Sequence, residues 1–247
     1  MSTYNHPEIY DLLHGTIKNY EQEATNIISL VDARLPEAAT LLDVGCGTGL
    51  HLSHLQKRFR CMGIDLSAQQ LAIARKRLKG IPLIEGDMRD FHLEEQFEVI
   101  TCLFGAIGYM RTKKDLVHAL RTMGLHLRSG GILILEPWYF TTSWIPGLIV
   151  HETLDYPDLK ISRMTSSSGR GRLSRMEMVY MIGKPESITT FRENHTMGLF
   201  SKDEYLFACA AAGFDAEYLP TAGPRGQFIA SRRAVSSSLE QHQSSTS

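Results

Sequence analysis

The feature that most constrains this chain is the run from Leu41 to Gly49, which reads LLDVGCGTG. A short apolar run is typical of a strand buried in a parallel sheet, and closely spaced glycines let the backbone turn tightly beside a ligand. The residues from Leu50 to Phe59 follow with helical spacing. Strand, glycine turn and helix N-terminus in this order predict the ligand-binding edge of an open α/β sheet.

The spacing of the glycines separates three classes of nucleotide-like ligand. A phosphate-binding P-loop needs a lysine after its last glycine, and Gly49 is followed by Leu50. A dinucleotide fingerprint places its third glycine one position later than Gly49. Here the pattern is G-x-G-x-G, with Asp43 just ahead of Gly45, and an acid suits an ammonium or sulfonium better than a pyrophosphate. This arrangement resembles motif I of the class I S-adenosylmethionine (SAM) methyltransferases.

Two further acids follow the next predicted strands. Asp65 ends the second strand about 20 residues after Asp43, where an acid accepts hydrogen bonds from ribose hydroxyls. Asp87 follows the third strand, and the resemblance implies that it binds the adenine amino group while an apolar side chain packs on the ring. One such acid alone is more often a helix N-cap, but one acid per strand predicts a cofactor site. We assign the following residues to SAM: Tyr10, Tyr20, Asp43, Gly45, Cys46, Gly47, Gly49, His51, Asp65, Leu66, Asp87, Met88 and Leu103.

Composition bounds the class of protein. The chain has 247 residues, 43% of them hydrophobic and 21% charged, as in a soluble globular protein. A net charge of −1 gives no reason to expect a nucleic acid partner. The four cysteines form no C-x-x-C pair, which favours a reducing compartment. No signal pattern or long apolar run is present, so we expect a cytoplasmic protein without a membrane partner.

The spacing of apolar residues predicts strands and helices in alternation up to about residue 140, and a different pattern after it. It predicts helices over residues 8–34, 49–58, 67–78, 113–127 and 202–212, and strands over 40–44, 61–65, 81–85, 97–103, 132–135, 214–219 and 226–231. Residues 149–197 alternate apolar and polar instead, with a Ser/Gly-rich break at 166–171, which predicts an antiparallel hairpin.

These elements predict an α/β fold, a Rossmann-like seven-stranded sheet of the class I SAM methyltransferase kind, mostly parallel, with an antiparallel β insertion after strand five. We expect four segments. They are an N-terminal helix with the SAM-binding core (1–140), the insertion on the substrate side (141–200), the last helix and two strands (201–233), and a disordered tail (234–247).

Further motifs narrow the resemblance and span nearly the whole chain. They are the opening with Tyr4 and Tyr10, GDMRDF at 86–91, the run 104–109, EPWYF at 136–140 and GPRG at 223–226. Together they resemble the nucleotide-linked amino-sugar N-methyltransferases that make N,N-dimethylamino sugars for macrolide-type antibiotics. The family commonly has alanine at Gly45, which we expect to be a tolerable exchange, and two serines at Gly105 and Ala106.

The resemblance implies transfer of methyl groups from SAM to the amine of a nucleotide-linked (dTDP) amino sugar, with release of S-adenosylhomocysteine. It also implies a homodimer. Two alternatives stay open, methylation of another small-molecule amine or hydroxyl and SAM binding without turnover. Nucleic-acid methylation is disfavoured because residues 102–109 lack an Asn/Asp-Pro-Pro-Tyr element. His51 and His54 have no third ligand, so no metal is expected.

Methyl transfer to an amine is an in-line displacement in which the protein mainly supplies position and electrostatics. Aromatic faces attract a sulfonium, which makes Tyr10 and Tyr20 candidates. Tyr4 and Tyr109 have family counterparts near the amine, so we assign them as catalytic residues that orient it or pass its proton on. A phenol with a pKa of about 10 is a poor base at neutral pH. Orientation is therefore expected to outweigh base catalysis.

Three arginines are candidates for binding the diphosphate, because a guanidinium binds phosphate through paired N–H groups. They are Arg163, Arg175 and Arg225, of which Arg225 is preferred. For any one of them, a solvated arginine on a strand edge is the more common alternative. Trp138 and Tyr139 follow strand five and are assigned to the substrate, where Trp138 stacks on the base or lines the sugar site. Simple packing against the sheet is the alternative for Trp138.

Overall fold

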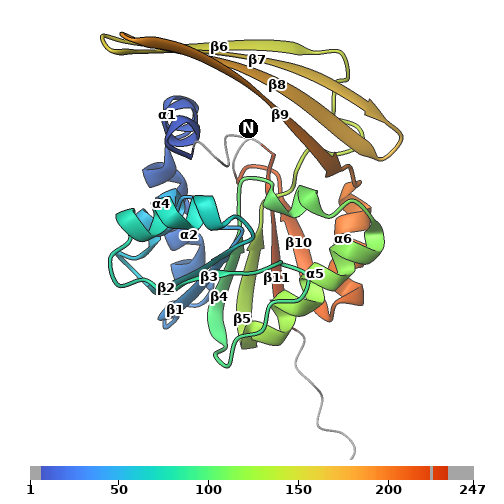
Figure 1. Cartoon of the computed structure of the whole chain (residues 1–247). Coiled ribbons are helices and arrows are strands. Elements are labelled where there is room, and N and C mark those ends of the chain that lie inside the picture. Colours follow the sequence, from blue (N-terminus) through green and yellow to red (C-terminus); the bar gives the residue numbers. More distant parts are fainter. Residues whose placement is uncertain (1–6, 223–224, 233–247) are drawn as a thin grey trace, which may run out of the picture.

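The computed structural model describes residues 7–222 and 225–232, which form two sheets and their helices (Figure 1). The helices are α1 (Pro7–Ile17), α2 (Tyr20–Arg34), α3 (Leu50–Leu55), α4 (Ala68–Arg77), η2 (Ala106–Tyr109), α5 (Lys113–His126) and α6 (Lys202–Ala211). The strands of the larger sheet are β1 (Thr40–Val44), β2 (Arg60–Asp65), β3 (Leu83–Glu85), β4 (Phe97–Cys102), β5 (Leu127–Leu135), β10 (Phe214–Leu219) and β11 (Gln227–Arg232). Those of the smaller sheet are β6 (Ile149–Tyr156), β7 (Leu159–Arg170), β8 (Leu173–Lys184) and β9 (Ser187–Gly198).

The larger sheet has seven strands in the order β10-β11-β5-β4-β1-β2-β3. β1 pairs in parallel with β2 and β4, whereas β11 is antiparallel to both of its neighbours. The strand order reverses between β1 and β4, which leaves a crevice at the carboxyl ends of these strands. The predicted fold class, a mostly parallel seven-stranded sheet, is confirmed.

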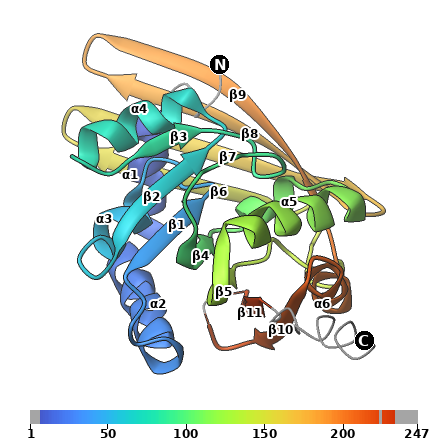
Figure 2. The ribbon, with the colours of Figure 1, turned by 90° about the horizontal axis from the view of Figure 1, so that it is seen from below.

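Both faces of β1 are covered, which explains why its sequence is apolar without alternation. Leu42 packs with residues of α5 and α6 in one core cluster. Leu41, which points the other way, packs with residues of α2, α3 and α4 in a second cluster. Figure 2 shows α2 and α3 on one side of the sheet and α5 and α6 on the other. The site described below lies at the end of this layered body.

The smaller sheet is antiparallel throughout, as the alternating sequence predicts, and it arches over one end of the larger sheet (Figure 1). The predicted break at 166–171 is wrong in extent, because β7 stays paired with β8 as far as Arg170. The turn is confined to Gly171, which has a φ of 63°, and Arg172.

Helix α1 joins the two sheets. Its Ile9 and Leu13 are buried in a cluster with Ile161, Tyr180 and Phe191 of the smaller sheet. The single helix predicted over 8–34 is wrong, because the chain leaves the helix after α1 and starts α2 at an N-cap. The side chain of Asn19 accepts a hydrogen bond from the backbone N–H of Gln22 at 2.9 Å, which favours a new helix start there.

Strand five is longer than predicted. Ser129, Gly130 and Gly131 fall between the helix predicted over 113–127 and the strand predicted over 132–135, but they lie within β5, which starts at Leu127 directly after α5. Gly130 has a φ of 75°, and the pairing with β4 shifts register between Phe97 and Val99. An irregular strand that tolerates glycine therefore replaces the expected loop.

The packing of α1 predicts a stability difference between two leucines. Leu13 is 2% exposed in the cluster beneath the smaller sheet, whereas Leu125 is 65% exposed. We expect Leu13→Ala to lower the free energy of unfolding by about 2–5 kcal/mol, because it leaves a cavity. Leu125→Ala is the matched control and should change it by less than about 0.5 kcal/mol. Urea unfolding measures both, and equal losses would contradict the burial of α1.

Candidate functional site

The glycine loop after β1 forms the floor of the site. Gly45, Gly47 and Gly49 have φ values of 77°, 56° and 77°, which L side chains rarely adopt. The N–H groups of Gly45 and Cys46 both donate to the carbonyl of Ile64, at 2.8 and 2.9 Å. A Cβ on Gly45 would lie 2.8 Å from the Cβ of Ala106. Alanine at position 45 is thus strained in this chain, contrary to the expected tolerance.

Asp65 fixes this loop to the next one. Its Oδ2 accepts from Gly47 N and its Oδ1 from Ser67 N, each at 2.8 Å. Burial raises the pKa of Asp65, while these backbone donors favour the charged form. The neighbouring Leu66 is 67% exposed and offers an apolar surface next to the carboxylate.

The loop after β3 brings a second acid and an apolar side chain to the same edge. Asp87 forms an ion pair with Arg89, at 2.5 Å, and this hydrogen bonding lowers the pKa of the Asp87 carboxyl. The Cε of Met88 lies 3.8 Å from the position of a Cβ built on Gly45. The predicted adenine residues therefore lie beside the glycine loop.

Asp43 is buried at the centre of the site. Its Oδ1 accepts a hydrogen bond from the Thr101 hydroxyl at 2.8 Å. Burial raises the pKa of Asp43 to about 6, although His51 and Thr101 favour the charged form. A cationic ligand group next to this carboxylate would stabilise its charged form.

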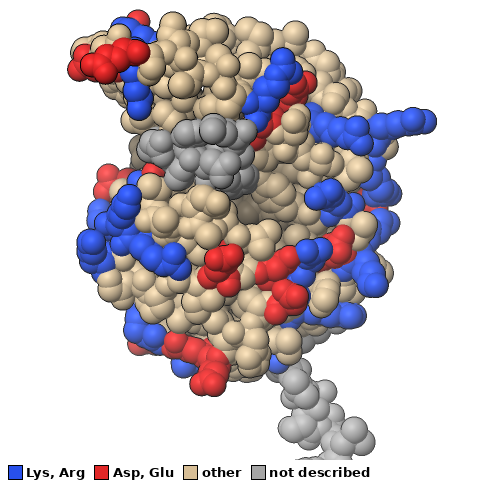
Figure 3. Space-filling view, in the orientation of Figure 1, with Lys and Arg blue, Asp and Glu red and all other residues tan. Residues whose placement is uncertain are grey.

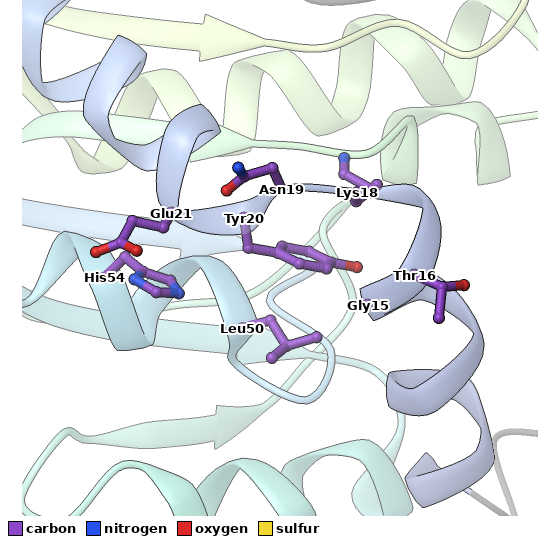
Figure 4. Close-up of a pocket in the computed structure, with 8 residues that line it drawn as sticks. All are labelled: Gly15, Thr16, Lys18, Asn19, Tyr20, Glu21, Leu50 and His54. Carbon is purple, nitrogen blue, oxygen red and sulfur yellow. The ribbon is translucent and has the colours of Figure 1, made fainter. Parts of the chain in front are cut away.

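A cavity of about 40 Å³ lies above the glycine loop. It is lined by Tyr10, Tyr20, Asp43, Gly45, Cys46, Thr48, Leu50, His51, Leu103 and Phe104, most of them predicted cofactor residues. An open hollow of about 550 Å³ adjoins it and shares Tyr20 and Leu50 with it. Figure 4 shows the Tyr20 ring between Leu50 and the turn that carries Lys18 and Asn19.

Helix α1 closes one side of this cavity. Asp11 accepts a hydrogen bond from the Thr48 hydroxyl at 2.5 Å and pairs with Arg77 at 2.5 Å. Burial, aided by the phenols of Tyr20 and Tyr109, raises the pKa of Tyr10. Tyr10 is therefore a neutral phenol whose ring and hydroxyl face the cavity.

Charged groups surround the tyrosines. Glu23 pairs with both Lys18 and His51, each at 2.8 Å. The Lys18 ammonium lies 3.9 Å from the ring centroid of Phe104 and 5.4 Å from that of Tyr20. These aromatic faces thus accept a cation. Lys18, Glu23 and Phe104 were not predicted as site residues. The sequence predicted that Tyr20 attracts a cation, but nothing in it indicated that the Phe104 ring lies beside the same cation.

Glu136 connects the end of β4 to the last loop. Its Oε2 accepts from the backbone N–H of Phe104 at 2.8 Å, and its Oε1 pairs with Arg225 at 2.5 Å. Arg225 also donates from Nε to the Pro137 carbonyl at 3.0 Å. The preferred diphosphate arginine is therefore partly engaged, because two of its five N–H groups already have partners.

Both tryptophans of the chain gather beside Arg225. The ring of Trp138 lies 4.9 Å from that of Tyr139 and 6.3 Å from that of Trp144. The Arg225 guanidinium lies 5.3 Å from the Trp138 ring centroid. Trp138 Nε1 donates to the Ser174 hydroxyl of β8 at 3.0 Å. Trp144, which the sequence prediction missed, completes an aromatic cluster (Trp138, Tyr139 and Trp144) at the junction of the sheets.

The other two predicted arginines lie on opposite faces of the smaller sheet. Arg163 is buried and pairs with Glu152 at 2.5 Å. Arg175 follows the buried Ser174 along β8 and is exposed, because successive side chains of a strand point to opposite faces. Arg175 is therefore not brought to the other substrate candidates.

The predicted catalytic Tyr109 ends η2 and meets the smaller sheet. Its hydroxyl lies 2.8 Å from Nδ1 of His195 on β9. Nε2 of the same imidazole lies 3.4 Å from Oε1 of Glu193. Tyr4 lies outside the described residues. Within the part of the chain that the structure describes, no group of three or more His, Cys, Asp and Glu side chains is arranged to hold a metal.

Comparison with known proteins decides the class of cofactor. A methyltransferase domain family matches residues 41–131. The dTDP-4-amino-2,3,4,6-tetradeoxy-D-glucose N,N-dimethyltransferase of Saccharopolyspora spinosa is 41% identical, over 92% of this chain and 93% of that protein. The dTDP-3-amino-3,6-dideoxy-alpha-D-glucopyranose N,N-dimethyltransferase of Streptomyces fradiae is 40% identical, over 89% and 87%. CalS10, an amino pentose methyltransferase of Micromonospora echinaspora solved with SAM, matches with a TM-score of 0.84 and 36% identity, over 91% and 97%.

The chain belongs to the SAM-dependent dTDP-amino-sugar N,N-dimethyltransferase family. The methyltransferase uses SAM, and the buried acids, the glycine loop and the neutral phenols fit a ligand that carries both an ammonium and a sulfonium. In the described residues, no helix is long and apolar enough to cross a membrane.

The buried Asp43 of this methyltransferase predicts a pH effect on its stability without SAM. The unfolded chain releases the Asp43 proton near pH 3.8, whereas the folded protein keeps it up to a pKa of about 6. The free energy of unfolding therefore falls as the pH rises through this window. Asp43→Asn removes this loss, so above pH 6 we expect it to be more stable than wild type by up to about 3 kcal/mol.

Urea unfolding at several pH values between 4 and 7.5 measures this difference. Asp158→Asn, at an exposed acid in the turn between β6 and β7, is the matched control and should follow the wild-type curve. A stability difference between Asp43→Asn and wild type that does not change with pH would contradict the raised pKa.

Proposed function

We propose that this methyltransferase dimethylates the amine of one dTDP-linked amino sugar for antibiotic biosynthesis. The observation that carries the proposal is the 41% identity to a dTDP-amino-sugar dimethyltransferase over 92% of the chain, which includes the smaller sheet. The two relatives compared above are named for 4-amino and 3-amino sugars. The similarity therefore supports a dTDP-linked amino sugar as the substrate, and the assay below determines whether the amine is at position 3 or 4.

The proposed SAM site uses the edge formed by the first three strands. SAM supplies a methyl group bonded to a positive sulfur. Asp43 is assigned to its ammonium, Asp65 and Leu66 to the ribose side, and Asp87 with Met88 to the adenine. The glycine loop with Cys46 and His51 forms the floor, and Tyr10, Tyr20 and Leu103 form the walls beside the sulfur.

The proposed substrate site lies between the aromatic cluster and the underside of the smaller sheet. Aromatic faces at 4.9–6.3 Å from one another suit a flat nucleobase. The N–H groups that Arg225 does not use for Glu136 and Pro137 suit a phosphate. Arg163 offers a second buried cation, paired with Glu152. The sugar amine then faces the cofactor from the side of Tyr109, near Tyr10.

We expect purified protein with SAM to add two methyl groups to a dTDP-linked 3-amino or 4-amino sugar. Mass spectrometry of a panel of such sugars measures the gain, and the same amino sugars without the nucleotide are the control. Methylation of free amines but of no nucleotide-linked sugar would favour the alternative small-molecule substrate. Binding of SAM without methylation of any acceptor would favour the alternative without turnover.

Arg225→Lys tests the phosphate contact. Lysine keeps the charge but loses the planar fork of N–H groups. We expect the KM for the nucleotide sugar to rise by roughly 10- to 100-fold, the effect of losing one hydrogen bond to a charged group, with a smaller change in kcat. Arg175→Lys, on the opposite face of the smaller sheet, is the matched control and should leave both constants unchanged. Equal effects of the two variants would remove Arg225 from the substrate site.

We further propose a cytoplasmic homodimer that does not bind nucleic acid. The outer face of the smaller sheet exposes Met164 and Met181, an apolar surface that suits a second copy of the chain. Sedimentation velocity tests this. The described cysteines are all unpaired, which suits a reducing compartment. Figure 3 shows Lys and Arg interspersed with Asp and Glu on the face in view, which does not suit a polyanion.

A further inference from the structure

Three side chains line up between η2 and the smaller sheet. The Tyr109 hydroxyl lies 2.8 Å from Nδ1 of His195, and Nε2 of His195 lies 3.4 Å from Oε1 of Glu193. We propose that these residues form a relay that removes the proton from the acceptor amine, with Tyr109 touching the amine and His195 taking up the proton. The inference rests on the proposed function, in that the acceptor is an amine.

The backbone holds the relay in place. Glycine at position 108 lets η2 approach the sheet, because a Cβ there would lie 2.8 Å from Cε of Met197. Glycine at position 198 lets the end of β9 approach Met110, where a Cβ would lie 2.2 Å from its carbonyl oxygen. Glu193 and Met197 are buried on the same face of β9 as His195. The imidazole is thus presented to Tyr109 by the close approach of β9 to η2 and to Met110, which follows it.

The three residues of the relay, Tyr109, His195 and Glu193, differ in their exposure to solvent. The side chains of Glu193 and His195 are 2% and 12% exposed, whereas Tyr109 is 37% exposed. Tyr109 is also near enough to the buried Tyr10 of the cofactor cavity to raise the pKa of that phenol. Tyr109 is therefore the most exposed of the three and lies on the side of Tyr10, whereas Glu193 and His195 are largely buried.

Several charged groups of the described residues lie on the elements packed around the relay, and we assign His195 as the member that takes up the proton. Arg163 on β7 and Lys18 after α1 are cations, and Glu152 on β6 is paired with Arg163. His14 on α1 also lies near Glu193, but burial lowers its pKa to about 3, so its imidazole is uncharged at neutral pH. Histidine is the side chain that ordinarily changes protonation between pH 5 and 8. Glu193 is placed to stabilise the imidazolium, as a carboxylate does in other histidine-based sites.

Dimethylation needs a proton acceptor twice, once before each methyl transfer. An aliphatic amine is mostly an ammonium at neutral pH and has no free lone pair. Tyr109 accepts the ammonium proton as its own phenolic proton passes to Nδ1 of His195, so the phenol is neutral before and after. The nitrogen lone pair then forms the N–C bond while the C–S bond of SAM breaks, and its electron pair stays on sulfur. His195 then releases its proton to solvent, to which its side chain is 12% exposed. The methylated ammonium loses its own proton by the same route before the second transfer.

The pH dependence of kcat separates a relay from a structural role. His195→Gln keeps a hydrogen-bond acceptor for Tyr109 but cannot hold the proton, and Tyr109→Phe breaks the chain. At pH 7 we expect each variant to lower kcat by roughly 10- to 100-fold, at or below the lower end for a positioned base. Above the pKa of the acceptor amine, solvent has already removed the proton, so both deficits should shrink to less than about threefold.

The assay uses whichever amine the wild-type protein methylates, with or without a nucleotide. His92→Gln, at an exposed histidine outside the site, is the matched control and should follow wild type. Calorimetric SAM binding and thermal unfolding check that each variant folds. Deficits that are constant with pH, or absent at pH 7, would overturn the relay. Methylation of a free amine with a normal relay profile would overturn only the nucleotide-sugar substrate, and methylation of a hydroxyl, or of nothing, would overturn both.

Discussion

The hydrogen bonds of Asp65 are the interaction on which the rest of the site depends. Its two carboxylate oxygens accept from Gly47 N and Ser67 N, so one half-buried acid fixes both the glycine turn after β1 and the start of α4. A buried carboxylate is tolerated only where such donors replace the water that it has lost. The positive φ of Gly47 lets its N–H group point at the acid. This edge of the sheet is therefore shaped by backbone, with the carboxylates of Asp43 and Asp65 held beside the glycine loop.

Helix α1 makes the two halves of the site depend on one another. One side of it is held to the glycine loop through Asp11, which contacts Thr48 and Arg77. Its apolar side is buried against the smaller sheet through Ile9 and Leu13. The same helix carries Tyr10 into the cavity. A change in the packing of the smaller sheet is thus transmitted through α1 to the wall of the cavity above the glycine loop.

The sequence predicted the features that local patterns encode. The seven-stranded sheet, the helix that starts after Ser67 and the antiparallel character of 149–197 follow from periodicity, and all are present. The break at Asn19 was missed, because the apolar pattern continues through it. The contact between Tyr109 and His195 joins residues far apart in sequence and depends on how β9 lies over η2. Trp144 was missed for the same reason, since only the junction of the two sheets brings it to Trp138.

The contacts of Arg225 could not be predicted from the motif that contains it, because its partner Glu136 lies far away in the sequence. The carboxylate accepts the N–H of Phe104 with one oxygen and pairs with Arg225 through the other. Phe104 has a φ of 53°, a conformation that costs energy in a non-glycine residue and persists only where its surroundings hold it. Glu136 supplies that hold, and Phe104 lines the cavity above the glycine loop. A ligand that drew the Arg225 guanidinium away from Glu136 would therefore also act on Phe104, because one buried carboxylate contacts both residues.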